Sequence, residues 1–341
     1  MTESSTASGT LMRWLSGSVA TRVMGVVSRM NLADAIGDGV DLDDLAAAYE
    51  IPPERMIRLL RALVDLDLCV PSGQDRFALT ELGSLLRKES PGSMADLVRL
   101  YTDQATHEVW MNLEAGLRSS RAAFDEVFGM RFFEYLRKEP ELSEVYNAAM
   151  GQLTRGVAAA LPEHYDFGGA GTVTDIGGGD GTLLAAVLER HPGLSGTVFD
   201  RAEVAAQAAD TLRAAGVLDR CTIATGDFFQ AVPAGAELYL IKSILHDWDD
   251  DSAATILRRC REAMSARSRL LIIEQVLPEI GNPGAPGDPD LADLTMLVIY
   301  GGKERTRAEF DQLCLRAGLI VTDVVPLTGQ RGVCVIETAP A

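Results

Sequence analysis

Basic residues are scarce in this chain of 341 residues, and acidic residues outnumber them. There are four histidines and 31 Lys and Arg residues against 49 Asp and Glu residues, which gives a formal net charge of −18. Such an acidic surface repels the phosphates of nucleic acids and anionic lipid headgroups, but it does not oppose a neutral or cationic small ligand. We therefore expect a small-molecule partner, with no nucleic acid and no membrane surface.

Cysteine is also sparse, and its spacing argues against two kinds of structure. The five cysteines stand singly, no Cys-x-x-Cys pair occurs, and the histidines do not cluster near them. A zinc site or a disulfide framework is therefore not expected. No apolar run approaches the roughly 20 residues of a membrane span, because Arg13 and Arg22 interrupt the apolar residues near the N-terminus. We expect a cytoplasmic protein with reduced thiols.

The first 95 residues follow the pattern of a winged helix. The first ten are small and polar, which predicts a disordered tail, and from Leu11 apolar residues recur at spacings of three and four, as in a helix. Asp41 is placed to cap a second helix, and Pro52-Pro53 begins a third. Two short apolar segments around the turn at 71–75 then predict a pair of strands.

A winged helix invites comparison with DNA-binding domains, but its charge has the wrong sign. Residues 1–100 hold 10 Lys and Arg against 14 Asp and Glu, a net charge of −4. The first helix is apolar and has no partner nearby in the sequence. We therefore expect residues 1–95 to form a dimerisation domain and the protein to be a homodimer. A regulator that senses a ligand through a winged helix stays open as an alternative.

Residues 96–165 form a helical connector rich in aromatic residues and methionine, among them Trp110 and Met150. Most of these side chains belong to the core, and a minority line a substrate pocket. From residue 166 to 341 strands alternate with helices, which predicts an α/β domain with a parallel, Rossmann-like sheet. A ligand then binds at the carboxyl ends of the first strands. The segment 281–290, with three prolines, is expected to be a surface loop and a candidate rim of the site.

A glycine-rich turn follows the first predicted strand of this domain. Its glycines at 177, 179 and 181 follow the spacing Gly-x-Gly-x-Gly, which differs from the Gly-x-Gly-x-x-Gly of nicotinamide-binding proteins. Asp180 lies within the turn, where a carboxylate is a poor neighbour for a pyrophosphate but suits a ligand with a positive sulfonium and ammonium. The turn therefore favours a cationic nucleoside ligand.

Residues suited to ligand binding follow three later strands. Asp200 ends the second strand, where a carboxylate accepts hydrogen bonds from both ribose hydroxyls, although it also suits the N-cap of the next helix. Asp227 and Phe228 follow the third strand and suit an adenine ring, although Asp227 taken alone is more often a turn residue. His246 follows the fourth strand. The acids at 249–251 are explained as the cap of the next helix, so no metal is expected.

Together these residues resemble the plant caffeate-type and bacterial small-molecule O-methyltransferases, including those of anthracycline and phenazine pathways. The resemblance spans nearly the whole chain and is carried by the motifs DIGGGDGT, VFD, GDFF, ILHDW, IIEQVLPE and GGKERT. It implies a class I methyltransferase domain, S-adenosyl-L-methionine as cofactor, and a small aromatic acceptor with a hydroxyl group. One departure is Arg201-Ala202, where many members have Leu-Pro after the ribose acid.

The resemblance also implies roles for individual residues. His246 would be the general base, flanked by Glu274 and Glu304. Met150, Trp110 and Asp247 would contact the acceptor. The implied cofactor-binding residues are Asp175, Gly177, Gly179, Asp200, Arg201, Asp227, Phe228, Lys242 and Ser243.

Methyl transfer to oxygen needs a base, because a phenol with a pKa of about 10 is mostly protonated at neutral pH. A histidine in this place removes that proton without a metal. A methyltransferase fold that uses its cofactor for hydroxylation or decarboxylation stays open as the alternative within enzymes.

Overall fold

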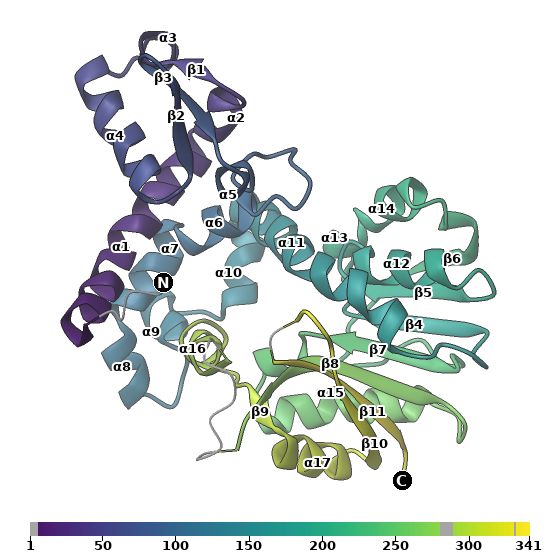
Figure 1. Ribbon diagram of the computed structural model, residues 1–341. Coiled ribbons are helices and arrows are strands. Elements are labelled where there is room, and N and C mark those ends of the chain that lie inside the picture. Colours follow the sequence, from purple (N-terminus) through teal and green to yellow (C-terminus); the bar gives the residue numbers. More distant parts are fainter. Residues whose placement is uncertain (1–5, 280–288, 331) are drawn as a thin grey trace. The chain divides into compact units, whose positions relative to one another are not determined.

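The computed structural model describes residues 6–279, 289–330 and 332–341, which belong to two compact units (Figure 1). One unit is Met1–His107 with Glu141–Gln152, and the other is Glu108–Pro140 with Leu153–Ala341. Two helices contribute residues to both units, α7 (Gln104–Met111) and α11 (Pro140–His164). Most of the predicted loop at 281–290 lies outside the described residues.

The first unit is a small helical domain with a three-stranded wing, in which the strand order is β1-β3-β2. Thr6 caps the first helix by accepting a hydrogen bond from the backbone of Gly9, so this helix begins at Ala7 and the predicted tail is too long. Asp41 caps α3 as predicted. The elements are α1 (Ala7–Arg29), α2 (Leu32–Ile36), β1 (Val40–Asp41), α3 (Leu42–Ala48), α4 (Pro53–Asp65), β2 (Cys69–Gly73), β3 (Arg76–Leu79), α5 (Glu81–Ser84) and α6 (Ala95–Tyr101).

One end of α1 is apolar yet exposed. Its later residues join the core of this unit, where Val27 is buried. Its earlier apolar residues do not, since Trp14 is 72% exposed and Val19 is 63% exposed. Leu11 and Leu15 are exposed as well. An apolar surface of this kind on a single chain is typical of a surface that another protein covers.

The second unit is built on one large sheet with the strand order β10-β11-β8-β7-β4-β5-β6. The pairs from β6 to β8 are parallel, which confirms the Rossmann-like sheet expected from the alternation of strands and helices. The strands are β4 (Thr172–Ile176), β5 (Ser195–Asp200), β6 (Cys221–Thr225), β7 (Leu238–Lys242), β8 (Arg269–Leu277), β9 (Arg305–Thr306), β10 (Leu319–Pro326) and β11 (Val333–Pro340). The short β9 pairs with β8 alone.

Helices cover both faces of this sheet, and the strands alternate their side chains between two cores. Val173 of β4 packs with α11, α12 and α14, whereas Ile176 of the same strand packs with α15 and α17. The helices are α8 (Leu113–Arg118), α9 (Ala123–Phe128), α10 (Phe132–Lys138), α12 (Thr182–Arg190), α13 (Ala202–Ala205), α14 (Ala208–Ala214), α15 (Asp250–Ala263), α16 (Pro289–Thr295) and α17 (Arg307–Arg316). Three short turns of other helix types are η1 (Leu218–Arg220), η2 (Leu245–Asp247) and η3 (Met296–Tyr300).

The last two strands run antiparallel to their neighbours. β10 and β11 pair with each other, and β11 pairs with β8. The link between β10 and β11 is too short for the crossover that a parallel pair requires, so the chain turns back as a hairpin. The helix predicted over 202–215 is also divided into α13 and α14.

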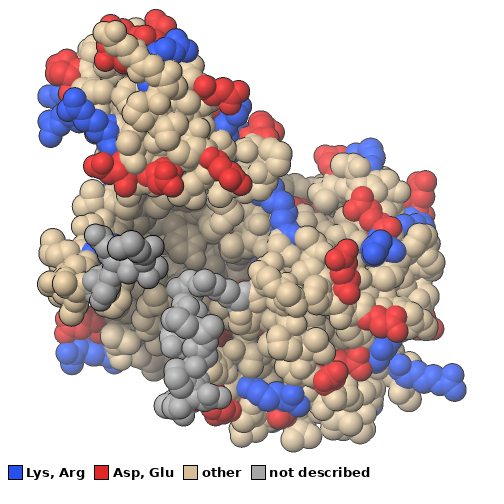
Figure 2. Space-filling model, viewed as in Figure 1, with Lys and Arg blue, Asp and Glu red and all other residues tan. Residues whose placement is uncertain are grey.

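None of the helices among the described residues is long and apolar enough to cross a membrane. On the face drawn in Figure 2, Asp and Glu side chains are interspersed with Lys and Arg. The charge of the chain is thus distributed over this face and is not concentrated in one patch.

Candidate active site

The glycine turn follows β4 and leads into α12. Gly177, Gly179 and Gly181 have φ angles of 69°, 59° and 78°, which is the left-handed region that favours glycine. A Cβ at Gly177 would lie 2.5 Å from Cδ1 of Ile244, whereas a Cβ at Gly179 would meet open space. The turn therefore brings bare backbone to the carboxyl edge of the sheet.

Two carboxylates of the predicted cofactor site lie at this turn. Asp200 ends β5 and accepts hydrogen bonds from the backbone of Gly179 (2.9 Å) and of Arg201 (2.7 Å). It is partly buried, and burial raises its pKa. Asp175 in β4 is buried, which raises its pKa to about 7, and its Oδ2 has no hydrogen-bond partner among the described residues. A buried carboxylate oxygen of this kind is suited to a cationic or hydrogen-bonding ligand.

Lys242 and Ser243 come next along the sheet, where β7 ends. Burial lowers the pKa of Lys242, although the carboxylates of Glu274 and Asp175 oppose that effect. Ser243 has a φ of 51°, and its backbone donates to Ile273 of the neighbouring strand. The strained residue marks the point where the chain leaves the sheet toward η2.

Asp227 and Phe228 follow β6. Asp227 is exposed, and its Oδ1 accepts from the backbone of Phe229 (2.9 Å), so it does form the turn that the sequence allowed. Phe228 packs at right angles to Trp248, with ring centroids 6.4 Å apart, and its ring lies 4.0 Å from the position of a Gly177 Cβ. Phe228 therefore borders the glycine turn.

Arg201 replaces the leucine that many members of the resembling family carry. Its guanidinium lies 5.9 Å from the ring centroid of Phe133 in α10, and 3.5 Å from the carboxylate of Glu203. It is thus held by a cation–π contact and an ion pair beside Asp200.

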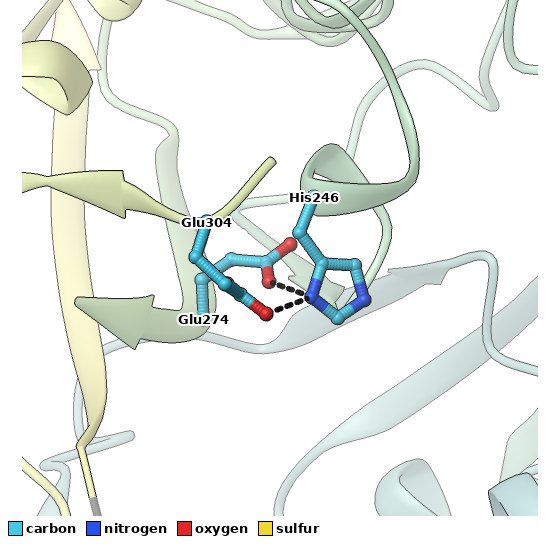
Figure 3. Close-up of side chains that lie close together, drawn as sticks. All are labelled: His246, Glu274 and Glu304. Atoms are coloured by element: carbon cyan, nitrogen blue, oxygen red, sulfur yellow. Dashed lines mark hydrogen bonds and ion pairs between the residues drawn. The ribbon is translucent and has the colours of Figure 1, made fainter. Parts of the chain in front are cut away.

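His246 lies in η2 and meets two glutamates from separate segments. Its Nδ1 is 2.9 Å from Oε1 of Glu304, which precedes β9, and 3.5 Å from Oε2 of Glu274 in β8. Figure 3 shows both carboxylates on the Nδ1 side of the ring, with Nε2 turned away from them. Nε2 lies 3.6 Å from Oδ1 of Asp247. The three predicted catalytic residues therefore come together.

Each glutamate is fixed by backbone contacts. Oε1 of Glu274 accepts from the backbone of Ile244 and of Leu245, each at 2.9 Å, which ties β8 to the turn that carries His246. The backbone of Glu304 donates to Asp293 of α16 at 2.8 Å. Both glutamate side chains are almost completely buried.

The buried acids determine the charge of the imidazole. Burial alone would lower the pKa of His246, but the carboxylates of Glu274, Glu304 and Asp247 outweigh it and raise the pKa to about 10. Burial raises the pKa of Asp247 to about 7 and also raises that of Glu274, while the histidine lowers both. The carboxylates therefore favour the protonated form of the ring.

The same three side chains have a spacing that suits a metal ion, because one ligand atom from each lies within 4.8 Å of the others. However, Nδ1 of His246 is within hydrogen-bond distance of Glu304, so a proton accounts for the contact. Of the acids at 249–251, which the sequence predicted to cap the next helix, Asp249 caps α15 as expected.

Aromatic side chains surround the turn that carries His246. Trp248 stacks on Phe133 with centroids 6.0 Å apart, and Phe133 is 5.7 Å from Tyr300 of η3. An open pocket of about 450 Å³ lies beside them, and its lining is mainly polar, with Asp247 next to Trp248 and Tyr300. This volume is within the range of small-molecule sites.

Two predicted acceptor residues lie on helices. Trp110 is half-buried in α7, and Met150 is half-buried in α11 within the other compact unit. Their contact with an acceptor stays a prediction. Sequence reasoning missed Asp293 and Arg305, which hold the site together. Arg305 lies within the motif GGKERT. Its position between Glu304 and a helix cap was the signal from which its role at the site could have been predicted.

Comparison with known proteins identifies the family. The model of the O-methyltransferase domain matches residues 110–320, and that of the O-methyltransferase dimerisation domain matches residues 12–89. The chain belongs to the O-methyltransferase family. The resemblance seen in the sequence is thereby confirmed, and the protein is an enzyme that uses S-adenosylmethionine.

Several relatives are enzymes of bacterial secondary-metabolite biosynthesis. The O-demethylpuromycin-O-methyltransferase of Streptomyces alboniger is 42% identical over 95% of this chain and 87% of its own length. N-methyltransferases also occur among the relatives, one of them acting on phenazine-1-carboxylate.

Solved structures agree in fold over nearly the whole chain. The crystal structure of LaPhzM has a TM-score of 0.92 with 35% identity, and covers 98% of this chain and all of that one. The O-methyltransferase NcsB1 of neocarzinostatin biosynthesis, solved with S-adenosylmethionine and 2-hydroxy-5-methyl naphthoic acid, has a TM-score of 0.76. It is 33% identical and covers 94% of this chain and 96% of its own.

Proposed function

We propose that this O-methyltransferase methylates a hydroxyl group of a small aromatic acceptor, with His246 as the general base and without a metal ion. The observation that carries the proposal is the contact of 2.9 Å between Nδ1 of His246 and Glu304, which leaves Nε2 on the opposite side of the ring. The aromatic side chains beside this histidine suit a flat acceptor.

The residues at the carboxyl edge of the sheet fit the cofactor. Gly177 and Gly179 present bare backbone, Asp200 is placed for a ribose, and the free Oδ2 of Asp175 is placed for a cationic group. When bound, S-adenosylmethionine supplies an electrophilic methyl group on a sulfonium. The acids of this edge stabilise that positive charge.

His246 prepares the acceptor oxygen. Glu304 accepts the Nδ1 proton and so fixes the tautomer of the neutral ring, in which Nε2 takes the proton of the acceptor. Because the surrounding carboxylates raise the pKa of His246, the neutral form of its ring is a stronger base toward a phenol than an ordinary imidazole is. The imidazolium that results stabilises the phenolate during transfer.

Replacing His246 by alanine tests the proposal. With labelled S-adenosylmethionine and a panel of phenols, His246→Ala should lower kcat by about 10²–10⁴-fold on ordinary phenols. The loss should be smaller for phenols of low pKa, since these are already ionised, and cofactor affinity measured by calorimetry should stay within about twofold. An equal loss on both kinds of phenol would mean that His246 only positions the acceptor.

Two further arms of the same assay address the alternatives. Transfer to amines but not to phenols would assign a nitrogen acceptor, as in the N-methyltransferase relatives, and consumption of acceptor without transfer of label would indicate a non-methylating reaction. Activity that is lost in a chelator and restored by a divalent cation would show that the three side chains hold a metal.

We also propose that the protein is a homodimer formed by its N-terminal unit. The exposed apolar part of α1 and the match to a dimerisation domain support this.

A further inference from the structure

Arg305 is the largest of the described side chains that are completely buried. It follows Glu304 in the chain and is the first residue of β9. Its Nε and Nη2 both donate to Oδ1 of Asp250, at 3.1 and 3.0 Å. A buried guanidinium is always charged and is unfavourable unless it is paired, so Asp250 accounts for how the charge is tolerated.

The other donors of Arg305 are directed at the backbone around His246. Nη1 donates to the carbonyl of Leu245 and Nη2 donates to that of Trp248, each at 2.8 Å. These two carbonyls lie on either side of His246, since Leu245 is the first residue of η2 and Trp248 follows its last residue. The carbonyl of Leu245 also accepts from the backbone of Trp248 at 3.3 Å. One planar group thus joins the two ends of the turn that carries the base.

The same residue also fixes the glutamates. Nη1 lies 3.4 Å from the carbonyl of Lys303, which precedes Glu304. The backbone of Arg305 pairs with Val276 of β8, the strand that carries Glu274. Arg305 is therefore in contact with each of the three segments that supply the catalytic cluster.

We propose that Arg305 is a positioning residue, which holds His246 and Glu304 in register by joining η2 to the segment 303–305. This inference rests on the proposed role of His246. Asp250 balances the charge of Arg305 but accepts through one oxygen only, so the remaining donors of the guanidinium are directed at backbone carbonyls. The planar guanidinium of Arg305 donates to two carbonyls at once. A lysine has a single ammonium and would not join both carbonyls in the same plane.

The test compares Arg305→Lys and Arg305→Met with Arg307→Met. Arg307 is a matched control, because it lies two residues further on and forms an exposed ion pair with Asp311. For the Arg305 variants we expect kcat to fall by about 100-fold, the loss that a misplaced catalytic group produces, while the KM for S-adenosylmethionine changes by less than about twofold. Arg307→Met should behave as the wild type.

A second readout follows His246 directly. In protein with labelled histidine, the resonance of His246 is identified by its absence in His246→Ala, and its pKa is measured by NMR. In Arg305→Lys the pKa should fall from about 10 toward the ordinary value, because the short contact with Glu304 is loosened. Should Arg305→Met not fold, Arg305→Lys decides by the same two measurements.

The outcomes separate this proposal from the proposed function. Folded Arg305 variants with wild-type titration of His246 overturn the positioning role, whether or not kcat changes. If His246→Ala retains its turnover, the general base is wrong, but the titration in Arg305→Lys still decides whether Arg305 positions the ring.

Discussion

His246 has more negative charge around it than a base of ordinary strength requires. Glu304 lies at hydrogen-bond distance from Nδ1, and Glu274 and Asp247 lie within 3.6 Å of the ring nitrogens. A single carboxylate would be enough to orient the ring. The three acids together raise the pKa of His246, so they stabilise the imidazolium that forms when the ring takes the proton of the acceptor. The cluster is thus suited to stabilise a phenolate after the proton has left.

The pH dependence of activity should report this charge. With an acceptor whose phenolic pKa is near 7, the active combination is phenolate with imidazolium. Activity should therefore rise through the pKa of the phenol and fall only above about 10, where the raised pKa of His246 is passed. In Glu304→Gln one negative charge is lost, the pKa of His246 falls, and the high-pH limb of kcat/KM should move to lower pH.

Asp311→Asn is the control for this measurement, since Asp311 pairs with Arg307 on the surface of α17. Its profile should match that of the wild type. A high-pH limb that stays in place in Glu304→Gln would show that Glu304 does not set the charge of the imidazole.

At the scale of elements, the sequence predicted the regular strands and helices because their signals are local. The glycine turn, the strand ends and the caps at Asp41 and Asp249 follow from neighbouring residues. The pairing of β11 with β8 and the short β9 did not follow, because they depend on contacts between distant segments. For the same reason Glu274 and Glu304 were assigned to the predicted site by a family resemblance, whereas Arg305 was not found.

The glycine turn allows a test of how strongly its conformation depends on glycine at each position. Gly177→Ala places a Cβ 2.5 Å from Cδ1 of Ile244 in addition to the left-handed φ, and should lower the free energy of unfolding by more than about 1–2 kcal/mol. Gly179→Ala has the same φ strain without a clash. Urea unfolding should therefore give a lower free energy of unfolding for Gly177→Ala than for Gly179→Ala.

Removing both contacting atoms provides the check on this ranking. In an Ile244→Ala background Cδ1 and Cγ1, which lie 2.5 and 2.9 Å from the Gly177 Cβ position, are absent, so the additional cost of Gly177→Ala should shrink toward that of Gly179→Ala. An unchanged gap would mean that Ile244 is not the cause.

At the scale of the whole molecule, the apolar end of α1 should determine the oligomeric state. Trp14→Glu with Val19→Glu adds charge to side chains that are 72% and 63% exposed, so a single chain should remain folded. Light scattering should give twice 36.6 kDa for the wild type and 36.6 kDa for the double variant. Leu315→Glu, at an exposed position of α17, is the control and should not change the mass. A wild type of 36.6 kDa at micromolar concentration would contradict the dimer.

The place of β11 in the sheet has a consequence for synthesis of the protein on the ribosome. Residues 333–340 cover the edge of β8, the strand that carries Glu274, although β8 itself is made some 60 residues earlier. Until that last strand emerges, β8 presents unpaired backbone groups to other nascent chains. A message cut short before codon 333 should therefore yield a polypeptide that retains the glycine turn after β4 but leaves the edge of β8 unpaired, and such a polypeptide should be prone to edge-to-edge aggregation.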